Sequence, residues 1–185
     1  MAAADAGRVD IAALLLVRGA NPHARTKFGS NALYYAATNA NADVAKLLID
    51  YGVKVSEGDS GLGSAILNDR SPIIKLLVEQ GADVNVLDAG TGRSTLMWAA
   101  QWTTADNVRL LLKHGAKVNA HTKSGETALM FAVWGCRPEN VRVLLGAGAD
   151  VNAVSQREGT VLSTAERQST PEPEVVELLK RAGAK

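Results

Sequence analysis

The chain has 185 residues, of which 46% are hydrophobic and 21% are charged, and its formal net charge at pH 7 is +1. This balance argues against a disordered chain and against a strongly basic nucleic-acid-binding domain. A single cysteine, Cys136, excludes an internal disulfide and a thiolate metal cluster. No apolar run approaches the roughly 20 residues of a membrane-spanning helix, so we expect no membrane insertion.

Six segments along the chain have apolar residues at spacings of three and four, which predicts helices with one buried face. They occupy residues 9–19, 42–52, 71–81, 106–115, 139–148 and 173–183. Each ends on a glycine, and these glycines, Gly19, Gly52, Gly81, Gly115, Gly148 and Gly183, are 33, 29, 34, 33 and 35 residues apart. We expect each glycine to adopt the left-handed conformation that terminates a helix.

A shorter apolar segment lies between successive long ones, at 31–38, 60–67, 94–101, 127–134 and 160–167. Its alanines permit two helices to approach closely. Each repeating unit is therefore predicted to be a short helix, a tight turn, a longer helix and a loop. No unit can bury its apolar face alone, whereas stacked units share one continuous core.

This pattern resembles the ankyrin repeat family over essentially the whole chain. The family signature reads Gly-x-Thr-Pro-Leu-His-x-Ala-Ala, and its leucine position is held here by Leu33, Leu62, Leu96, Leu129 and Leu162. The proline is absent from all five copies, and the histidine is replaced by Tyr34, Gly63, Met97, Met130 and Ser163. The resemblance implies an all-α ankyrin-repeat solenoid of stacked helix-turn-helix units with β-hairpin-like finger loops.

The register predicts a single domain, 1–185, made of a half-repeat at 1–25 and repeats at about 26–56, 57–87, 88–121, 122–154 and 155–185. Because the first register begins inside a short helix, either the array carries a minimal N-terminal half-repeat or the chain is a fragment of a longer protein, which we favour. In the third unit, residues 53–57 replace nine residues of the finger. The fourth unit gains one residue within 88–94, and the last gains two within 168–174.

Two short motifs resemble catalytic or phosphate-binding loops. The sequence Gly58-Asp59-Ser60-Gly61 matches that of the nucleophile loop of a serine protease. The repeat register instead aligns Ser60 with Asn31, Ser94 and Thr127, which predicts a helix N-cap. The segment 90–95, Gly-Thr-Gly-Arg-Ser-Thr, lacks the first glycine and the lysine of a Walker A loop. We therefore expect no catalytic, cofactor-binding or metal-binding residues.

Four of the eight aromatic residues lie in two consecutive short helices: Trp98, Trp102, Phe131 and Trp134. The resemblance implies that finger tips and short helices line a concave groove. Trp98 and Phe131 share one register position and are expected to be half-buried between neighbouring units. Trp102 and Trp134, at the end of the short helix, are expected to contact a partner. The predicted groove also carries Arg93, Gln101, Lys123, Glu126 and Arg167, and toward the N-terminus Lys27, Phe28 and Thr38.

These features predict a non-catalytic scaffold that binds a protein partner through its groove and finger tips. The alternative is an ankyrin domain of a larger enzyme, transporter or regulator, which it positions or inhibits. An enzyme in its own right would require His114 or His121 to share a pocket with nearby carboxylates. We expect a monomer without cofactors and without nucleic acid. A cytoplasmic location is favoured, and a periplasmic or secreted one stays open.

Overall fold

The computed structural model describes residues 1–55, 61–168 and 172–185. Contacts between residues divide the chain into two compact units. Unit 1 comprises Met1–Asp83 and unit 2 comprises Val84–Lys185, and each is described by itself.

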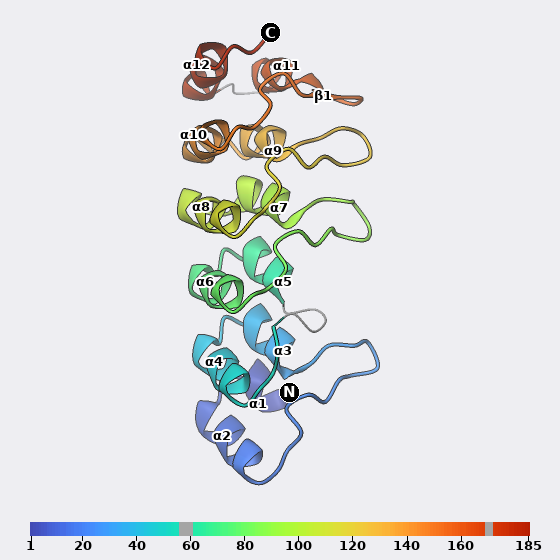
Figure 1. Cartoon of the computed structure of the whole chain (residues 1–185), viewed down its shortest axis with the longest axis vertical. Coiled ribbons are helices and arrows are strands. Elements are labelled where there is room, and N and C mark those ends of the chain that lie inside the picture. The colour runs from blue at the N-terminus through green and yellow to red at the C-terminus, as the bar shows by residue number, and fades with distance from the viewer. Residues whose placement is uncertain (56–60, 169–171) are drawn as a thin grey trace. The chain divides into compact units, whose positions relative to one another are not determined.

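Unit 1 is a stack of helix pairs. α1 (Ala2–Asp5) pairs with α2 (Val9–Val17), α3 (Ala32–Thr38) with α4 (Ala42–Asp50), and α5 (Leu62–Leu67) with α6 (Ser71–Glu79). The first members, α1, α3 and α5, pack on one another as an inner layer, while α2, α4 and α6 form an outer layer (Figure 1).

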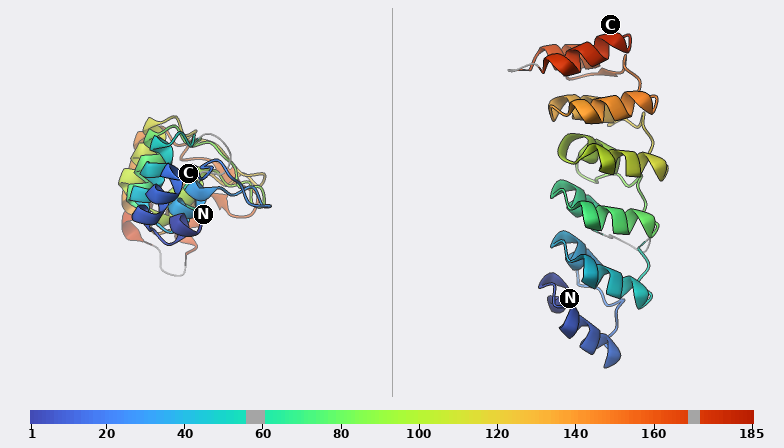
Figure 2. Two further views of the ribbon diagram at one scale, coloured as in Figure 1. Left: turned by 90° about the horizontal axis from the view of Figure 1, so that it is seen from below. Right: turned by 90° about the vertical axis from the view of Figure 1, so that its left-hand side faces the viewer.

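Unit 2 repeats this arrangement. α7 (Thr95–Trp102), α9 (Ala128–Trp134) and α11 (Val161–Glu166) form the inner layer, and α8 (Ala105–Lys113), α10 (Pro138–Gly146) and α12 (Pro173–Arg181) the outer one. Within each unit the outer helices lie side by side (Figure 2). Stacked helix-turn-helix pairs with finger loops confirm the predicted all-α solenoid class.

The three finger loops that precede the inner helices of unit 2 are hairpin-like. In the last finger, β1 (Val154–Ser155) and β2 (Gly159–Thr160) pair antiparallel, and single antiparallel bridges join Leu87 to Ser94 and His121 to Thr127 in the two fingers before it. These bridges end immediately before the inner helices and thereby fix how each helix enters the stack.

All six glycines that end the long segments are left-handed, with φ between 83° and 89°. At each one the glycine N–H and the following N–H donate to carbonyls of the last helical turn; in α8, Gly115 donates to Leu112 and Ala116 to Leu111. This is the Schellman termination. A Cβ at these positions would meet nothing within 4 Å, so the backbone angle and not crowding requires glycine. The prediction from the sequence is confirmed.

The predicted helix caps are only partly confirmed. Asn31 and Ser94 accept hydrogen bonds from the N–H groups of Tyr34 and Met97, as expected. Thr127 occupies the cap position of α9, but its hydroxyl makes no cap bond and is buried without a partner among the described residues. Ser60 lies outside the described residues, and α5 begins at Leu62 with Gly61, at φ 78°, in the cap position.

The finger lengths follow the predicted irregularities. The connection from α4 to α5, 51–61, is three residues shorter than that from α2 to α3, 18–31, and α5 starts one register position late. These two differences account for the four residues missing from the third unit. Val53 and Val55 at the start of the shortened finger are buried, while residues 56 and 57 lie outside the described part of the chain. The connection from α6 to α7, 80–94, is one residue longer, as predicted.

Asparagine side chains connect successive repeats within unit 2. The Nδ2 of Asn85 donates to the Gly115 carbonyl at 3.0 Å, and its Oδ1 accepts from Lys117 N–H at 3.0 Å. Asn119 makes the same pair of bonds to Gly148 and Asp150, at 3.0 and 2.8 Å. Asn152 continues the series to Gly183 and Lys185, at 3.5 and 3.0 Å. We call Asn85, Asn119 and Asn152 the asparagine ladder.

Candidate functional site

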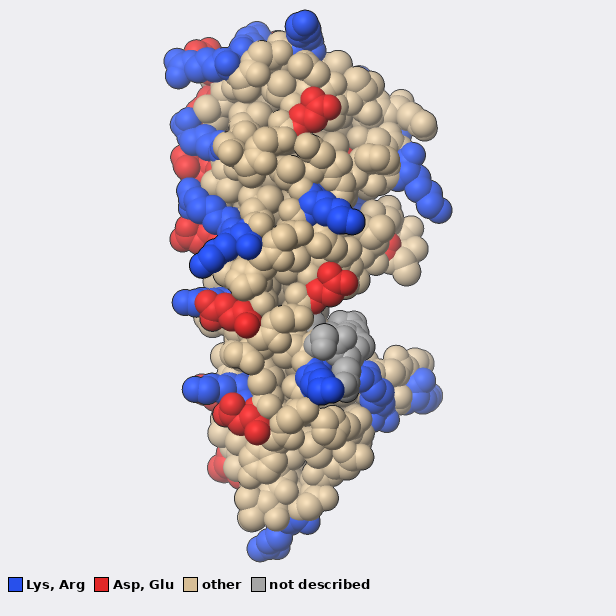
Figure 3. All heavy atoms as spheres, in the orientation of Figure 1, with Lys and Arg blue, Asp and Glu red and all other residues tan. Residues whose placement is uncertain are grey.

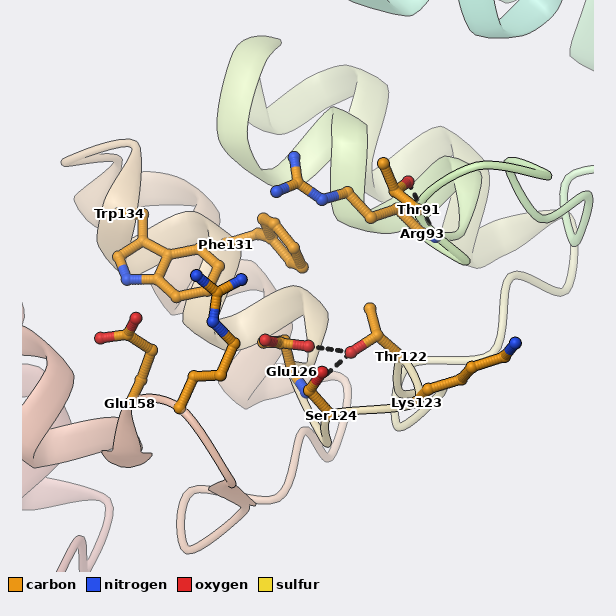
Figure 4. Close-up of a pocket in the computed structure, with 10 residues that line it drawn as sticks. Thr91, Arg93, Thr122, Lys123, Ser124, Glu126, Phe131, Trp134 and Glu158 are labelled. Carbon is orange, nitrogen blue, oxygen red and sulfur yellow. Dashed lines mark hydrogen bonds between the residues drawn. The ribbon is translucent and has the colours of Figure 1, made fainter.

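A pocket of about 420 Å³ lies in unit 2, where three successive fingers converge on α9 (Figure 4). Each finger contributes side chains, and α9 contributes two aromatic rings. The lining residues are Thr91 and Arg93 of one finger, Thr122, Lys123, Ser124 and Glu126 of the next, Arg157 and Glu158 of the last, and Phe131 and Trp134 of α9. We call this the finger pocket.

The Arg93 guanidinium lies against two aromatic rings of the inner layer. Its Cζ is 4.5 Å from the centroid of the Trp98 ring and 4.4 Å from that of Phe131. A guanidinium attracted to ring faces in this way is held in a defined position. A guanidinium has five N–H donors, and ring contacts of this kind do not use them as conventional hydrogen bonds do.

The backbone that presents Arg93 is held by a polar turn. The Arg93 carbonyl accepts from Asp88 N–H at 2.8 Å. The Asp88 carboxylate in turn accepts from the Thr91 hydroxyl and the Thr91 N–H, both at 2.6 Å. The Thr91 side-chain bond, followed by the Thr91 backbone bond, lowers the pKa of the Asp88 carboxyl. The turn is therefore most stable with Asp88 ionised, which fixes the finger tip at neutral pH.

The aromatic floor of the pocket is an edge-to-face pair. The centroids of the Phe131 and Trp134 rings are 4.7 Å apart and the ring planes meet at 84°. Phe131 is only 1% exposed, so the expectation that it is half-buried was wrong, whereas Trp98 is half-buried as expected. Trp134 is also half-buried, which leaves part of its ring at the pocket surface.

Glu126 brings a buried carboxylate to the pocket. Its residue is 7% exposed, and the Thr122 hydroxyl donates to its Oε2. The same hydroxyl oxygen accepts from Glu126 N–H at 3.2 Å (Figure 4). These bonds tie the carboxylate to its own finger.

The remaining charges of the finger pocket are at its rim. Lys123 and Arg157 are exposed, and within the described part of the chain neither forms an ion pair. Glu158 is already paired within the chain: Arg167 donates to its carboxylate at 3.0 Å and to its backbone carbonyl at 2.8 Å. Arg167 therefore lies beside the pocket, as the counterion of one of its residues.

Several predicted site residues lie elsewhere. Trp102, at the end of α7, is 48% exposed but does not line the finger pocket. Gln101 is half-buried, and its Oε1 has no hydrogen-bond partner among the described residues. Thr38 uses its hydroxyl to bond the Tyr34 carbonyl of its own helix at 2.9 Å.

Phe28 and Lys27 belong to unit 1. Phe28 lies on the first finger and is 81% exposed. The Lys27 Nζ is 4.9 Å from the centroid of its ring. They form a second exposed aromatic feature, separate from the finger pocket.

Sequence reasoning missed five lining residues: Thr91, Thr122, Ser124, Arg157 and Glu158. The repeat register contained a usable signal. Arg93 and Glu126 hold the same position in adjacent fingers, and Thr91, Ser124 and Arg157 each lie two residues before it or its equivalent. Neighbouring repeats bring equivalent positions close together.

His121 is exposed, with its Nδ1 3.1 Å from the Thr122 carbonyl, and no group of three His, Cys, Asp or Glu side chains in the described ranges is arranged to hold a metal ion. Across those same ranges no helix has both the length and the apolar character to cross a bilayer. On the face shown in Figure 3, acidic and basic side chains are intermixed.

A family model for ankyrin repeats, built of three copies, matches residues 1–88 and 62–155. The chain belongs to the ankyrin repeat family. Ankyrin repeats are generally non-catalytic modules of protein–protein interaction. A search of curated protein sequences gave no match.

Solved ankyrin structures resemble the chain closely. An ankyrin repeat domain from Acinetobacter baumannii is 29% identical with a TM-score of 0.86, over 99% of this chain and 96% of that one. The human ASB11 ankyrin repeat domain is 26% identical with a TM-score of 0.83, over 99% and 82%. A chain of the complex between the predatory endopeptidase Bd0816 of Bdellovibrio bacteriovorus and the immunity protein Bd3460 is 26% identical with a TM-score of 0.82, over 97% and 95%.

Proposed function

We propose that the chain is a non-catalytic scaffold that binds a protein partner through the groove and finger tips of its ankyrin repeats. The observation that carries this proposal is the finger pocket, in which three fingers converge on an aromatic floor. Tryptophan and arginine are the residues most enriched at binding hot spots, and Trp98, Trp134 and Arg93 are in contact or adjacent here.

The surface is preformed, which favours binding. The Arg93 side chain is held by two rings, its finger by the Asp88 turn, and neighbouring fingers by the asparagine ladder. Association otherwise costs about 0.5–1.5 kcal/mol for each flexible side chain that must be immobilised. A rigid surface avoids part of this cost, so a few contacts suffice for specific binding.

Two exposed aromatic features lie outside the finger pocket, and we propose them as further contacts. Trp102, at 48% exposure, extends the site along α7, and Phe28, at 81% exposure, is positioned for contact by the first finger. Aromatic side chains are enriched in protein interfaces relative to the rest of the surface, and tryptophan is enriched at binding hot spots.

The test is affinity capture of partners from the native source with the wild-type chain and a Trp102→Ala, Trp134→Ala double variant. We expect the captured partner to bind the double variant at least tenfold more weakly, since hot-spot truncations cost about 2 kcal/mol or more each. Both rings are at least partly exposed, so the far-ultraviolet circular dichroism of the variant is expected to match the wild type.

Tyr51→Ala is the matched control, because Tyr51 is an aromatic residue at the end of outer helix α4 and is 43% exposed. It should leave affinity unchanged. A partner that binds the double variant and the wild type equally well would contradict the site assignment.

A second candidate is that the partner is an enzyme, which the chain positions or inhibits. The relative crystallised as a complex of an endopeptidase with an immunity protein favours this form of the proposal. The measurement is the activity of a captured enzyme with and without a stoichiometric amount of this chain. Activity that is unchanged at saturation would exclude inhibition while leaving binding intact.

A further inference from the structure

We propose that the finger pocket selects its partner through an acidic side chain, Asp or Glu, of an extended segment, which binds the ring-held guanidinium of Arg93. This inference rests on the proposed scaffold function and names the chemistry that the partner must supply.

Arg93 is prepared to bind a carboxylate. Its guanidinium contacts the rings of Trp98 and Phe131, at 4.5 and 4.4 Å. Its charge helps to lower the pKa of the Asp88 carboxyl in the same finger, but among the described residues it forms no salt bridge, and Asp88 does not line the pocket. A planar guanidinium donates two parallel N–H bonds to a carboxylate, and the rings hold this fork in place beforehand. The neighbouring Phe131 ring is buried, which reduces the screening of the arginine charge by water.

The charges that line the pocket leave a positive excess. Arg93, Lys123 and Arg157 are cationic, while Glu126 and Glu158 are anionic. The Glu158 charge is compensated by Arg167 at 3.0 Å, and the Glu126 carboxylate accepts a bond from the Thr122 hydroxyl. An incoming carboxylate therefore meets three cations and one uncompensated acid, so attraction outweighs repulsion.

The dimensions and walls leave room for an acidic side chain together with a neighbouring residue of a peptide. A volume of about 420 Å³ lies toward the lower end of ligand pockets, which are about 300–1,000 Å³. Trp134 offers an apolar wall beside the charged groups. We therefore expect the acidic residue to be next to an aliphatic or aromatic residue that packs on Trp134.

The probe is a library of random peptides displayed on phage and selected against the whole chain, immobilised through an N-terminal tag. On the wild type we expect an acidic position to be enriched several-fold beside an apolar one. Arg93→Glu should abolish the acidic preference. Arg109→Glu is the matched control, because Arg109 is an exposed arginine on outer helix α8 that pairs with Asp106, and it should retain the preference.

A second variant protects the test against a folding defect of Arg93→Glu. Lys123→Glu with Arg157→Glu changes two exposed side chains and leaves the ring contacts of Arg93 in place. It should weaken the best acidic peptide by at least tenfold. Replacing the acidic residue of that peptide by its amide should weaken binding to the wild type by a similar factor.

The outcomes separate this inference from the proposed function. Enriched peptides with no acidic position, or with one that survives both charge-reversed variants, would overturn the acidic-partner inference while supporting the scaffold. Enrichment of basic peptides would overturn it too and would assign recognition to Glu126. The absence of any enriched peptide on the wild type would count against both proposals.

Discussion

At the scale of single residues, a positive φ explains why glycine recurs at the end of each long helix. The helix-terminating glycines all have φ near 85°, and a second left-handed position recurs in the turn between the two helices of a pair. There the residue is Gly7 in the first pair, but Ala40, Asp69 and Cys136 in later ones, with φ of 61°, 48° and 49°. The left-handed conformation destabilises an L-residue by about 1–2 kcal/mol, so these three positions are strained.

Exchanging glycine and alanine at two of these positions should shift stability in opposite directions. Gly115→Ala places a Cβ at φ 89° and should destabilise by about 1–2 kcal/mol. Ala40→Gly relieves the same strain at φ 61° but gives the unfolded chain about 0.4–1 kcal/mol of extra entropy, so we expect a net gain of about 0.5–1 kcal/mol. Urea unfolding measures both. Gly115→Asn, which tolerates this conformation, should lose less than Gly115→Ala, and the reverse order would contradict the strain argument.

At the scale of elements, side-chain amides hold one repeat to the next. Asn140 of α10 is 2% exposed, and its Nδ2 donates to the carbonyls of Ala100 and Thr103 at 2.9 and 3.0 Å, which satisfies the end of α7 in the preceding repeat. The asparagine ladder does the same for the fingers. These side chains supply hydrogen-bond partners for backbone groups near helix ends that have no partner within the helix.

Removing one ladder residue should loosen the fingers without unfolding the helices. Asn119→Ala deletes two bonds, of 3.0 and 2.8 Å, whose backbone partners are near water, so we expect a loss of about 1 kcal/mol. Asn152→Ala is the internal comparison, because its bond to Gly183 is longer, at 3.5 Å, and it should cost less. Chemical denaturation of both variants checks the order. Equal losses of unfolding free energy in the two variants would mean that the shorter ladder bonds are no more stabilising than the longer one.

At the scale of the whole molecule, the two units differ in how their repeats are connected. Unit 2 carries the asparagine ladder, whereas the equivalent positions of unit 1 are His23 and Ser56, of which the second lies outside the described residues. In unit 1, α2 also leaves Val9, Ile11, Leu14, Leu15 and Val17 exposed, by 38–71%. Stability in repeat proteins is approximately a sum of contributions from each repeat and each interface between neighbours. These differences therefore affect the stability of unit 1 locally.

We therefore expect unit 1 to open before unit 2. In hydrogen exchange followed by mass spectrometry, peptides from α2–α4 should exchange faster than peptides from α8–α10, and the difference should grow in low concentrations of urea. Asn119→Ala provides the control, since it should reduce protection in unit 2 and leave unit 1 unchanged. Uniform protection across both units would contradict the assignment.

The sequence by itself determined the repeat order, the helix positions, the left-handed glycines, the finger lengths and two of the caps, Asn31 and Ser94. These features depend on φ, on hydrogen bonds within one turn and on apolar spacing, all of which are local in the chain. Only the tertiary structure decided that Phe131 is buried while Trp98, in the same register, is half-exposed, that the Thr127 hydroxyl makes no cap bond, and that Arg93 lies against two rings. The burial of Phe131 and the position of Arg93 depend on a contact between adjacent repeats, and equivalent positions therefore differ from one repeat to the next. The finger pocket belongs to this second class, because three fingers that are distant in the sequence supply its charges.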